Sequence, residues 1–111
     1  MRNVKLEFLP PLIEKEIMVV EEVVFNTNNI QLAPFKASRW EVFPGKSSLI
    51  DVHEVRECWF IAKGEGELIR NEKKEGKVKQ GDILFFDSNE SHSICNSGKE
   101  NILIFSIWWN V

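Results

Sequence analysis

Short runs of β-branched and aromatic residues recur along the chain, separated by glycine, proline, asparagine and aspartate. The runs are residues 17–25, 37–43, 57–62, 66–70, 82–86 and 101–109. Runs of this length and composition, bounded by turn residues, are typical of β-strands. No segment of useful length has the period of an amphipathic helix, although one helical turn is expected in residues 10–17. Residues 71–76, NEKKEG, are expected to form a charged turn. The sequence therefore predicts an all-β sandwich or barrel.

Length, charge and cysteine content narrow the class of protein. The 111 residues suit one domain, and no repeat or linker divides residues 1–111. The net charge is −3 and the charges are interspersed, so we expect no nucleic acid as a partner. We also expect no membrane span, because the sequence has no apolar run of about 18 residues, and no secretory leader, because it has no charged segment followed by an apolar one at its start. Cys58 and Cys95 lack metal-pair spacing, which favours reduced thiols in a cytoplasmic protein.

The stretch from residue 51 to residue 57 combines acids with a histidine. In an extended chain Asp51 and His53 share a face, and Glu57 has the same parity as Trp59. Carboxylates and an imidazole that point into an apolar interior are costly unless they are paired or bound to a metal. Their oxygen and nitrogen atoms are suitable ligands for a divalent cation. The stretch also begins like the helical zinc motif H-E-x-x-H, but residue 57 is not histidine and a strand follows, which excludes that motif.

Glycines bracket this stretch at fixed intervals. Gly45 is followed by five residues, Asp51-x-His53, three residues, Glu57, six residues and Gly64. The spacing resembles the first motif of the cupin superfamily, in which a histidine stands in place of Asp51.

A second set of residues repeats this kind of spacing. Gly81 is followed by five residues, Asp87-x-Asn89, two residues, His92, three residues and Asn96. The spacing resembles the second cupin motif, in which proline and glycine stand in place of Asp87 and Asn89. Both replacements favour turns, so the bend between the strands should persist. The two motifs contain both histidines of the chain.

The resemblance implies a small single-domain cupin, a jelly-roll barrel also described as a double-stranded β-helix. The first motif spans about residues 45–64 and the second about residues 81–96. It also implies one metal ion inside the barrel, with four ligands: Asp51, His53, Glu57 and His92. Asp51 either binds the metal directly, binds it through a water molecule, or does not bind it. The alternative is a cupin that has lost its metal.

The predicted ligands constrain the metal and its chemistry. Two carboxylates and two imidazoles balance a divalent ion and favour Mn²⁺ or Fe²⁺, with Ni²⁺ or Zn²⁺ as alternatives. Open coordination positions would bind a small oxygen-rich metabolite. One hypothesis is therefore a metal-dependent isomerase, epimerase or lyase, or a dioxygenase. The other is a non-catalytic module that binds or senses a small molecule. Trp59, Trp40, Arg39 and Glu41 are expected to line the pocket. The remaining acid–base candidates are Glu41, Glu54, Arg39 or a ligand carboxylate.

The run at residues 101–109 is apolar at successive positions, so both of its faces should be covered. One face can pack on the core. The other requires either the N-terminal strand at residues 19–25 or a second subunit. The resemblance to small cupins implies a homodimer, and twofold dimers are the commonest oligomers.

Overall fold

The computed structural model describes residues 5–111, in which it has eleven strands and no helix. The strands are β1 (Leu12–Glu14), β2 (Met18–Glu22), β3 (Asn26–Thr27), β4 (Ile30–Gln31), β5 (Lys36–Val42), β6 (Arg56–Lys63), β7 (Glu65–Arg70), β8 (Lys73–Lys79), β9 (Ile83–Phe86), β10 (His92–Cys95) and β11 (Ile102–Trp109). The all-β prediction is confirmed. Within these residues there is accordingly no helix capable of spanning a membrane.

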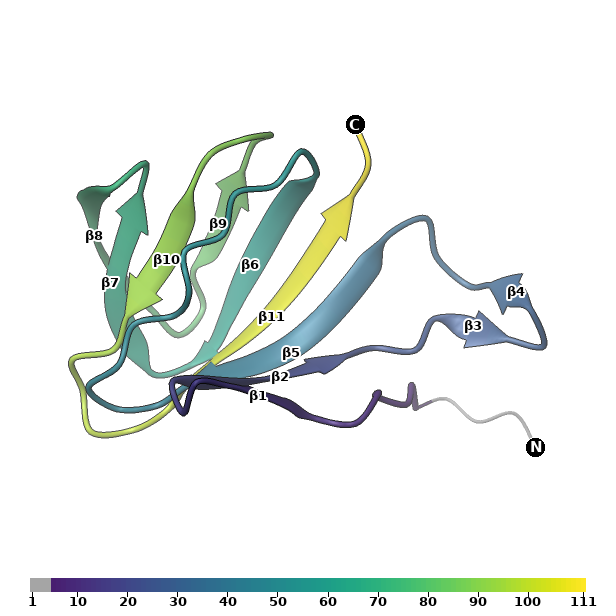
Figure 1. The fold of residues 1–111 in the computed structure, drawn as a ribbon, viewed down its shortest axis with the longest axis horizontal. Coiled ribbons are helices and arrows are strands. Elements are labelled where there is room, and N and C mark those ends of the chain that lie inside the picture. Colours follow the sequence, from purple (N-terminus) through teal and green to yellow (C-terminus); the bar gives the residue numbers. More distant parts are fainter. Residues whose placement is uncertain (1–4) are drawn as a thin grey trace.

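The strands form two main sheets. The larger sheet has six strands in the order β1-β2-β5-β11-β6-β9, and the smaller has three in the order β10-β7-β8. β3 and β4 pair only with each other and project away from both sheets (Figure 1). The segment between β5 and β6 runs along β10, where Ser47 bridges Cys95 and Asp51 bridges His92. This pairing brings the first motif beside the second.

The hydrophobic core lies between the two sheets. Alternate residues of each strand point to the same face, so each sheet contributes every second side chain to the core. The buried residues of the larger sheet are Met18, Trp40, Val42, Trp59, Ile61, Phe86, Ile102 and Ile104, and those of the smaller sheet are Leu68, Val78 and Ile94. This packing fixes the strands that carry the candidate site.

Two local predictions are wrong. Residues 12–14 form β1, which pairs with β2, so no helical turn occurs between residues 10 and 17. The connection at residues 15–17 has positive φ at Lys15 (50°) and Glu16 (58°), and Ile17 N donates to the Glu14 oxygen, as in a type I′ turn. In residues 71–76 only Asn71 and Glu72 form the turn, and β8 begins at Lys73. β8 is an edge strand with mostly exposed side chains, which is why a charged sequence suits it.

β11 lies inside the larger sheet, between β5 and β6. One of its faces packs in the core through Ile102, Ile104 and Ser106. On the other face Phe105 is 38% exposed. The N-terminal strand β2 pairs edge to edge with β5 in the same sheet, so it does not cover that face as a second layer.

Candidate metal centre

β6 carries the most deeply placed carboxylate of the first motif. Glu57, Trp59 and Ile61 alternate along β6 and all three are buried, as expected from their parity. The indole Nε1 of Trp59 donates a hydrogen bond to Glu57 Oε2 over 3.0 Å. The other oxygen, Oε1, lies 3.2 Å from His92 Nε2. The Glu57 carboxylate is therefore held at both oxygens.

β10 carries His92, whose side chain is only 3% exposed. Its ring stacks on Phe86 with centroids 4.3 Å apart and an interplanar angle of 24°. Its Nδ1 lies 2.9 Å from the backbone oxygen of Glu90. Because a carbonyl oxygen can only accept, Nδ1 carries a hydrogen, and the neutral ring then has its lone pair on Nε2, facing Glu57. The Nε2 lone pair and the Glu57 carboxylate repel each other unless a cation lies between them. A second proton or a metal ion supplies that cation.

The pKa of His92 reflects this surrounding. Burial lowers it, but the hydrogen bonds to Glu57 and to the Glu90 carbonyl, together with the charges of Glu57 and Asp51, outweigh burial and raise it above its ordinary value. The site therefore favours positive charge at His92 Nε2 even though the ring is buried. A backbone carbonyl that fixes the tautomer is also a common partner of metal-ligating histidines.

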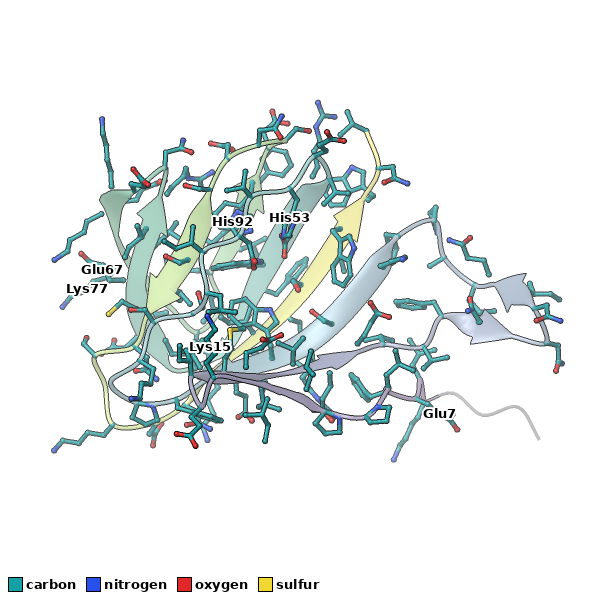
Figure 2. All side chains as sticks on the ribbon, in the orientation of Figure 1. Glu7, Lys15, His53, Glu67, Lys77 and His92 are labelled. Carbon is teal, nitrogen blue, oxygen red and sulfur yellow. The ribbon has the colours of Figure 1, made fainter. Side chains whose placement is uncertain are left out.

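Asp51 and His53 lie at the rim, on the segment that precedes β6. Their side chains are 50% and 45% exposed, and His53 Nε2 lies 4.0 Å from Asp51 Oδ1. Partial burial raises the pKa of the Asp51 carboxyl, while His53 and His92 oppose the shift. Figure 2 shows His53 and His92 close together between the sheets, and their ring centroids are 5.8 Å apart.

Three of the four predicted ligands are brought together. Donor atoms of Asp51, His53 and His92 lie within 4.8 Å of one another, so this group could hold a metal ion. Glu57 is outside that group, although its 3.2 Å distance from His92 Nε2 suits neighbouring ligands. Two such ligands of an octahedral ion lie about 3 Å apart when each bond is about 2.1 Å. The donor set therefore fits a divalent ion, while ligation by each of the four residues stays a prediction.

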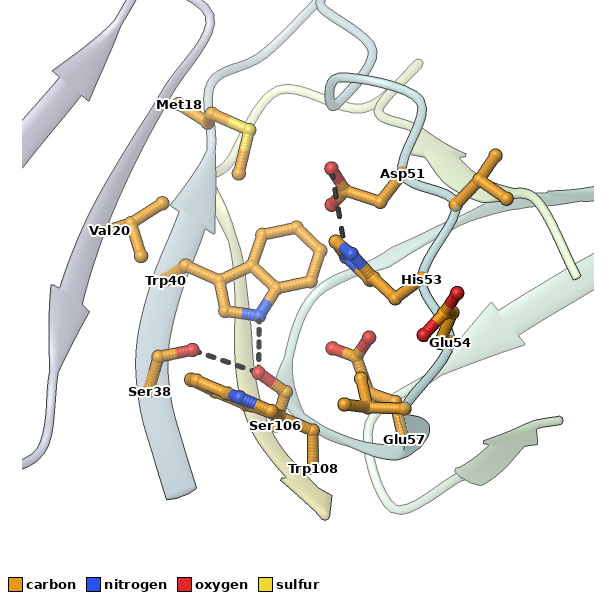
Figure 3. A pocket seen from close by; sticks show the side chains of 12 residues that line it. Met18, Val20, Ser38, Trp40, Asp51, His53, Glu54, Glu57, Ser106 and Trp108 are labelled. Carbon is orange, nitrogen blue, oxygen red and sulfur yellow. Dashed lines mark hydrogen bonds and ion pairs between the residues drawn. The ribbon is translucent and has the colours of Figure 1, made fainter. Parts of the chain in front are cut away.

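A cavity of about 600 Å³ opens beside these residues. It is lined by Met18, Val20, Ser38, Trp40, Asp51, Val52, His53, Glu54, Val55, Glu57, Ser106 and Trp108. Figure 3 shows the acids and His53 on one side, with Trp40, the serines and Met18 and Val20 on the other. The cavity is thus a mixed pocket with a polar wall and a largely apolar wall.

The four residues expected to line the pocket lie in different places. Trp40 lines the cavity, and Trp59 packs edge-on against it with ring centroids 4.9 Å apart. Trp59 is not a lining residue, because it lies buried and holds Glu57. Arg39 and Glu41 alternate with Trp40 on β5 and point to the other face, where Arg39 pairs with Glu21. Of the acid–base candidates only Glu54 lines the cavity.

The sequence interpretation missed several lining residues. Ser38 has the parity of Trp40 on β5, so its orientation could have been predicted. Ser106 is its direct cross-strand partner on β11, and Trp40 Nε1 donates to Ser106 Oγ over 3.2 Å. Met18 and Val20 reach the cavity because β2 pairs with β5, a long-range pairing that no local pattern indicates.

Comparison with known families decides the family. Residues 38–108 match the model of the cupin domain, and this match covers more than half of the chain. The chain belongs to the cupin family. Both glycine-bracketed motifs lie inside the matched region, so the resemblance of their spacing is confirmed at the level of the family.

A curated relative of this cupin is the oxalate-binding protein of Thermotoga maritima. The two are 35% identical over 71 residues, which is 63% of this cupin and 58% of the relative. The match therefore spans less than two thirds of the relative's length.

Solved structures resemble this cupin over most of its length. A protein of Photorhabdus luminescens has a TM-score of 0.80 at 19% identity, with 98% of this chain and 89% of that chain covered. A cupin 2 conserved barrel domain protein of Salinispora arenicola has a TM-score of 0.78 at 22% identity, covering 92% and 82%. A predicted oxalate decarboxylase of Thermotoga maritima has a TM-score of 0.74 at 24% identity, covering 99% and 97%. At these identities the likeness shows the cupin fold alone.

Proposed function

We propose that this cupin binds one divalent transition metal through Asp51, His53, Glu57 and His92. The observation that carries the proposal is His92, whose two ring nitrogens both face oxygen acceptors. A metal ion at Nε2 would remove that conflict, and the Glu90 carbonyl already holds Nδ1. Mixed oxygen and nitrogen ligands favour Mn²⁺ or Fe²⁺, with Ni²⁺ or Zn²⁺ as alternatives.

We further propose that the metal and the cavity together hold a small oxygen-rich metabolite. When bound, the metal would supply a Lewis acid that polarises a ligand oxygen. The protein's own contribution is positioning: Trp59 holds Glu57, the Glu90 carbonyl holds His92, and Trp40 and Trp108 restrict water on the apolar side. The oxalate-binding relative supports a small-molecule ligand for this site.

The site supports two functions of different classes. One is a metal-dependent isomerase, epimerase or lyase, or a dioxygenase with a redox-active metal. For proton transfer, Glu54 is the one ionisable side chain among the described lining residues that lies outside the proposed ligand set. The other function is a non-catalytic module that binds or senses its ligand. The small number of candidate bases favours this second function.

Elemental analysis of the purified protein tests the metal proposal. We expect about one equivalent of a first-row transition metal in the wild type and none in a His92→Ala variant. A wild-type protein that neither retains nor takes up a stoichiometric metal would refute the proposal. Oxygen consumption by the metal-loaded protein, assayed with candidate hydroxy-carbonyl and hydroxy-acid ligands, then separates a dioxygenase from the other functions.

The homodimer and the cytoplasmic location stay predictions. The outer face of the larger sheet supports the dimer, because Phe60, Phe85 and Phe105 are 36%, 45% and 38% exposed on neighbouring strands. We propose that a second copy of this chain packs on that face. Sedimentation velocity should give a dimer for the wild type and a monomer for Phe60→Glu, and a monomeric wild type would contradict the proposal.

The free Cys58 and Cys95 support a reducing compartment.

A further inference from the structure

The wall of the cavity around the candidate metal centre carries acidic side chains and no lysine or arginine among the described residues. Three of the described lining residues are carboxylates, namely Asp51, Glu54 and Glu57, and none is lysine or arginine. The arginines nearby in the sequence are engaged elsewhere, because Arg39 pairs with Glu21 and Arg56 with Asp87. Positive charge for an anionic ligand would therefore have to come from the metal alone.

The metal would leave little net positive charge for an anionic ligand. With a divalent ion, the carboxylates of Asp51 and Glu57 cancel the charge of the metal, and Glu54 makes the wall negative. A histidine at residue 51 would leave one more unit of positive charge at the same place. Like charges repel at short range even where water and salt partly screen them, as at the exposed Glu54. A dicarboxylate is therefore poorly matched to this wall.

The opposite wall offers hydrogen bonds without charge. Ser38 Oγ and Ser106 Oγ lie 2.9 Å apart, and Trp40 Nε1 donates to Ser106 Oγ. The two hydroxyls carry two hydrogens, and their mutual hydrogen bond uses one. The second hydroxyl hydrogen can donate to a ligand, because both serines line the cavity. A carbonyl or hydroxyl oxygen is a suitable acceptor, and it does not require a counter-charge.

We propose that the cavity selects an uncharged hydroxycarbonyl or polyol rather than a dicarboxylate, with Glu54 and the Ser38–Ser106 pair as its specificity determinants. Glu54 repels anions from the metal side, and the serine pair binds an uncharged oxygen on the far side. This inference rests on the proposed metal site. It separates the ligand of this cupin from oxalate, which names the Thermotoga maritima relative.

Two probes, one uncharged and one anionic, test the inference. The full chain is loaded with Mn²⁺, and the loading is verified by elemental analysis before any ligand is added. Dihydroxyacetone and oxalate are then titrated, and water-proton relaxation by the bound Mn²⁺ reports each binding curve. Each affinity is divided by that of the same probe for aqueous Mn²⁺, which removes the intrinsic preference of the ion. We expect the ratio to be higher for dihydroxyacetone than for oxalate, and the reverse order would overturn the inference.

Two variants show whether the named residues carry the selectivity. Glu54→Gln should tighten oxalate by about threefold or more and leave dihydroxyacetone within about twofold. Ser38→Ala should weaken dihydroxyacetone by about two- to tenfold, the effect of one hydrogen bond. Glu65→Gln and Ser97→Ala, which do not line the cavity, are the matched controls.

Failure of this inference can be distinguished from failure of the metal proposal. If Mn²⁺ does not load, the proposed function fails and the inference fails with it. If Mn²⁺ loads but both variants change both probes in parallel, the metal site stands and the inference is wrong. Glu54 is exposed, so Glu54→Gln still reports on selectivity even if Ser38→Ala fails to fold.

Discussion

The two halves of the candidate metal centre differ in how the fold holds them. The inner half, Glu57 and His92, lies on the regular strands β6 and β10, with side chains 12% and 3% exposed. The outer half, Asp51 and His53, lies on the segment before β6, with side chains 50% and 45% exposed. A bridge between Asp51 and His92 ties this outer half to β10, and the backbone nitrogen of Asn89 donates to the His53 oxygen.

This difference in burial predicts which substitutions should change stability and which should change metal binding alone. Buried polar groups must be satisfied whenever the chain is folded, so Glu57 and His92 are hydrogen-bonded to each other and to Trp59 and Glu90. Exposed groups can be solvated and can rearrange at little cost. Changes in the inner half should therefore affect both folding and metal binding, whereas changes in the outer half should affect metal binding alone.

The largest effect is expected for His92→Ala in metal-free protein. This change leaves Oε1 of the buried Glu57 without its partner, while Trp59 still donates to Oε2, and it should lower the free energy of unfolding by about 3 kcal/mol. His53→Ala, the matched change at the rim, should alter it by no more than about 0.5 kcal/mol. Urea unfolding measures both values. Both variants should lose Mn²⁺ affinity by at least about a hundredfold. Equal destabilisation by the two changes would contradict the distinction between the halves.

A smaller effect is expected for Gly66→Ala, which would push β7 away from β10, the strand that carries His92. Gly66 lies on β7, and an added Cβ would be 2.7 Å from the backbone oxygen of Cys95 on β10 and 2.7 Å from Cδ1 of Ile102. Ile102 Cδ1 is the end of a side chain and can rotate away, but the Cys95 oxygen is backbone and cannot move without shifting β10, so we expect a loss of about 2 kcal/mol in urea unfolding.

Gly45→Ala is the control beside the outer half. An added Cβ at Gly45 would meet nothing within 4 Å, but the φ of +75° strains any L side chain. We expect a loss of about 1 kcal/mol. If Gly45→Ala proved more destabilising than Gly66→Ala, the close contact between β7 and β10 would not be the larger cause of destabilisation.

Asp51→Ala sharpens the comparison within the outer half. If Asp51 binds the metal directly, its removal should lower Mn²⁺ affinity by about tenfold or more, which corresponds to about 1.4 kcal/mol. Asp51→His restores a histidine at that position and should keep the affinity within about tenfold of the wild type. Competition titration with a metal indicator measures both, with Glu54→Gln as the charge control. Full affinity in Asp51→Ala would show that Asp51 is not a ligand.

The sequence singled out residues of both halves, because the spacing of the two motifs includes both. Two motifs at fixed intervals, together with the parity of β6, were enough to single out Asp51, His53 and His92, which the fold brings together. Spacing does not indicate burial, however. Nothing local distinguishes His92, which stacks on Phe86, from His53, which stays exposed at the rim.

The residues that shape the cavity were harder to predict. Ser38 and Ser106 are 68 residues apart in sequence and meet only through the pairing of β5 with β11. The register of such a pair depends on tertiary packing rather than on the composition of either strand. The same holds for Met18, which reaches the cavity from β2. The charged strand β8 was missed because an exposed edge strand lacks an apolar pattern.

The smallest effect is expected for Asp87→Asn, in the turn that replaces the proline of the second motif. Asp87 Oδ1 accepts hydrogen bonds from Arg56 Nε over 3.0 Å and from the backbone nitrogen of Ser88 over 2.8 Å. These bonds hold the pKa of the Asp87 carboxyl below its ordinary value. The ionised form is therefore favoured in the folded chain. Its contribution to stability is present above the unfolded pKa of about 3.9 and is lost as the pH falls through the lower folded value.

Asp87→Asn should accordingly lower the Tm slightly at pH 7, and the difference from the wild type should shrink as the pH falls below about 3.9. Thermal unfolding across this range measures it, with Glu65→Gln as a control for charge alone. Because Asp87 is at the surface, the difference should also decrease in high salt. A difference that is independent of pH would mean that the side chain acts through turn geometry rather than through its charge. Since Arg56 begins β6 immediately before Glu57, an effect of Asp87→Asn on Mn²⁺ affinity would link this exposed ion pair to the inner half of the site.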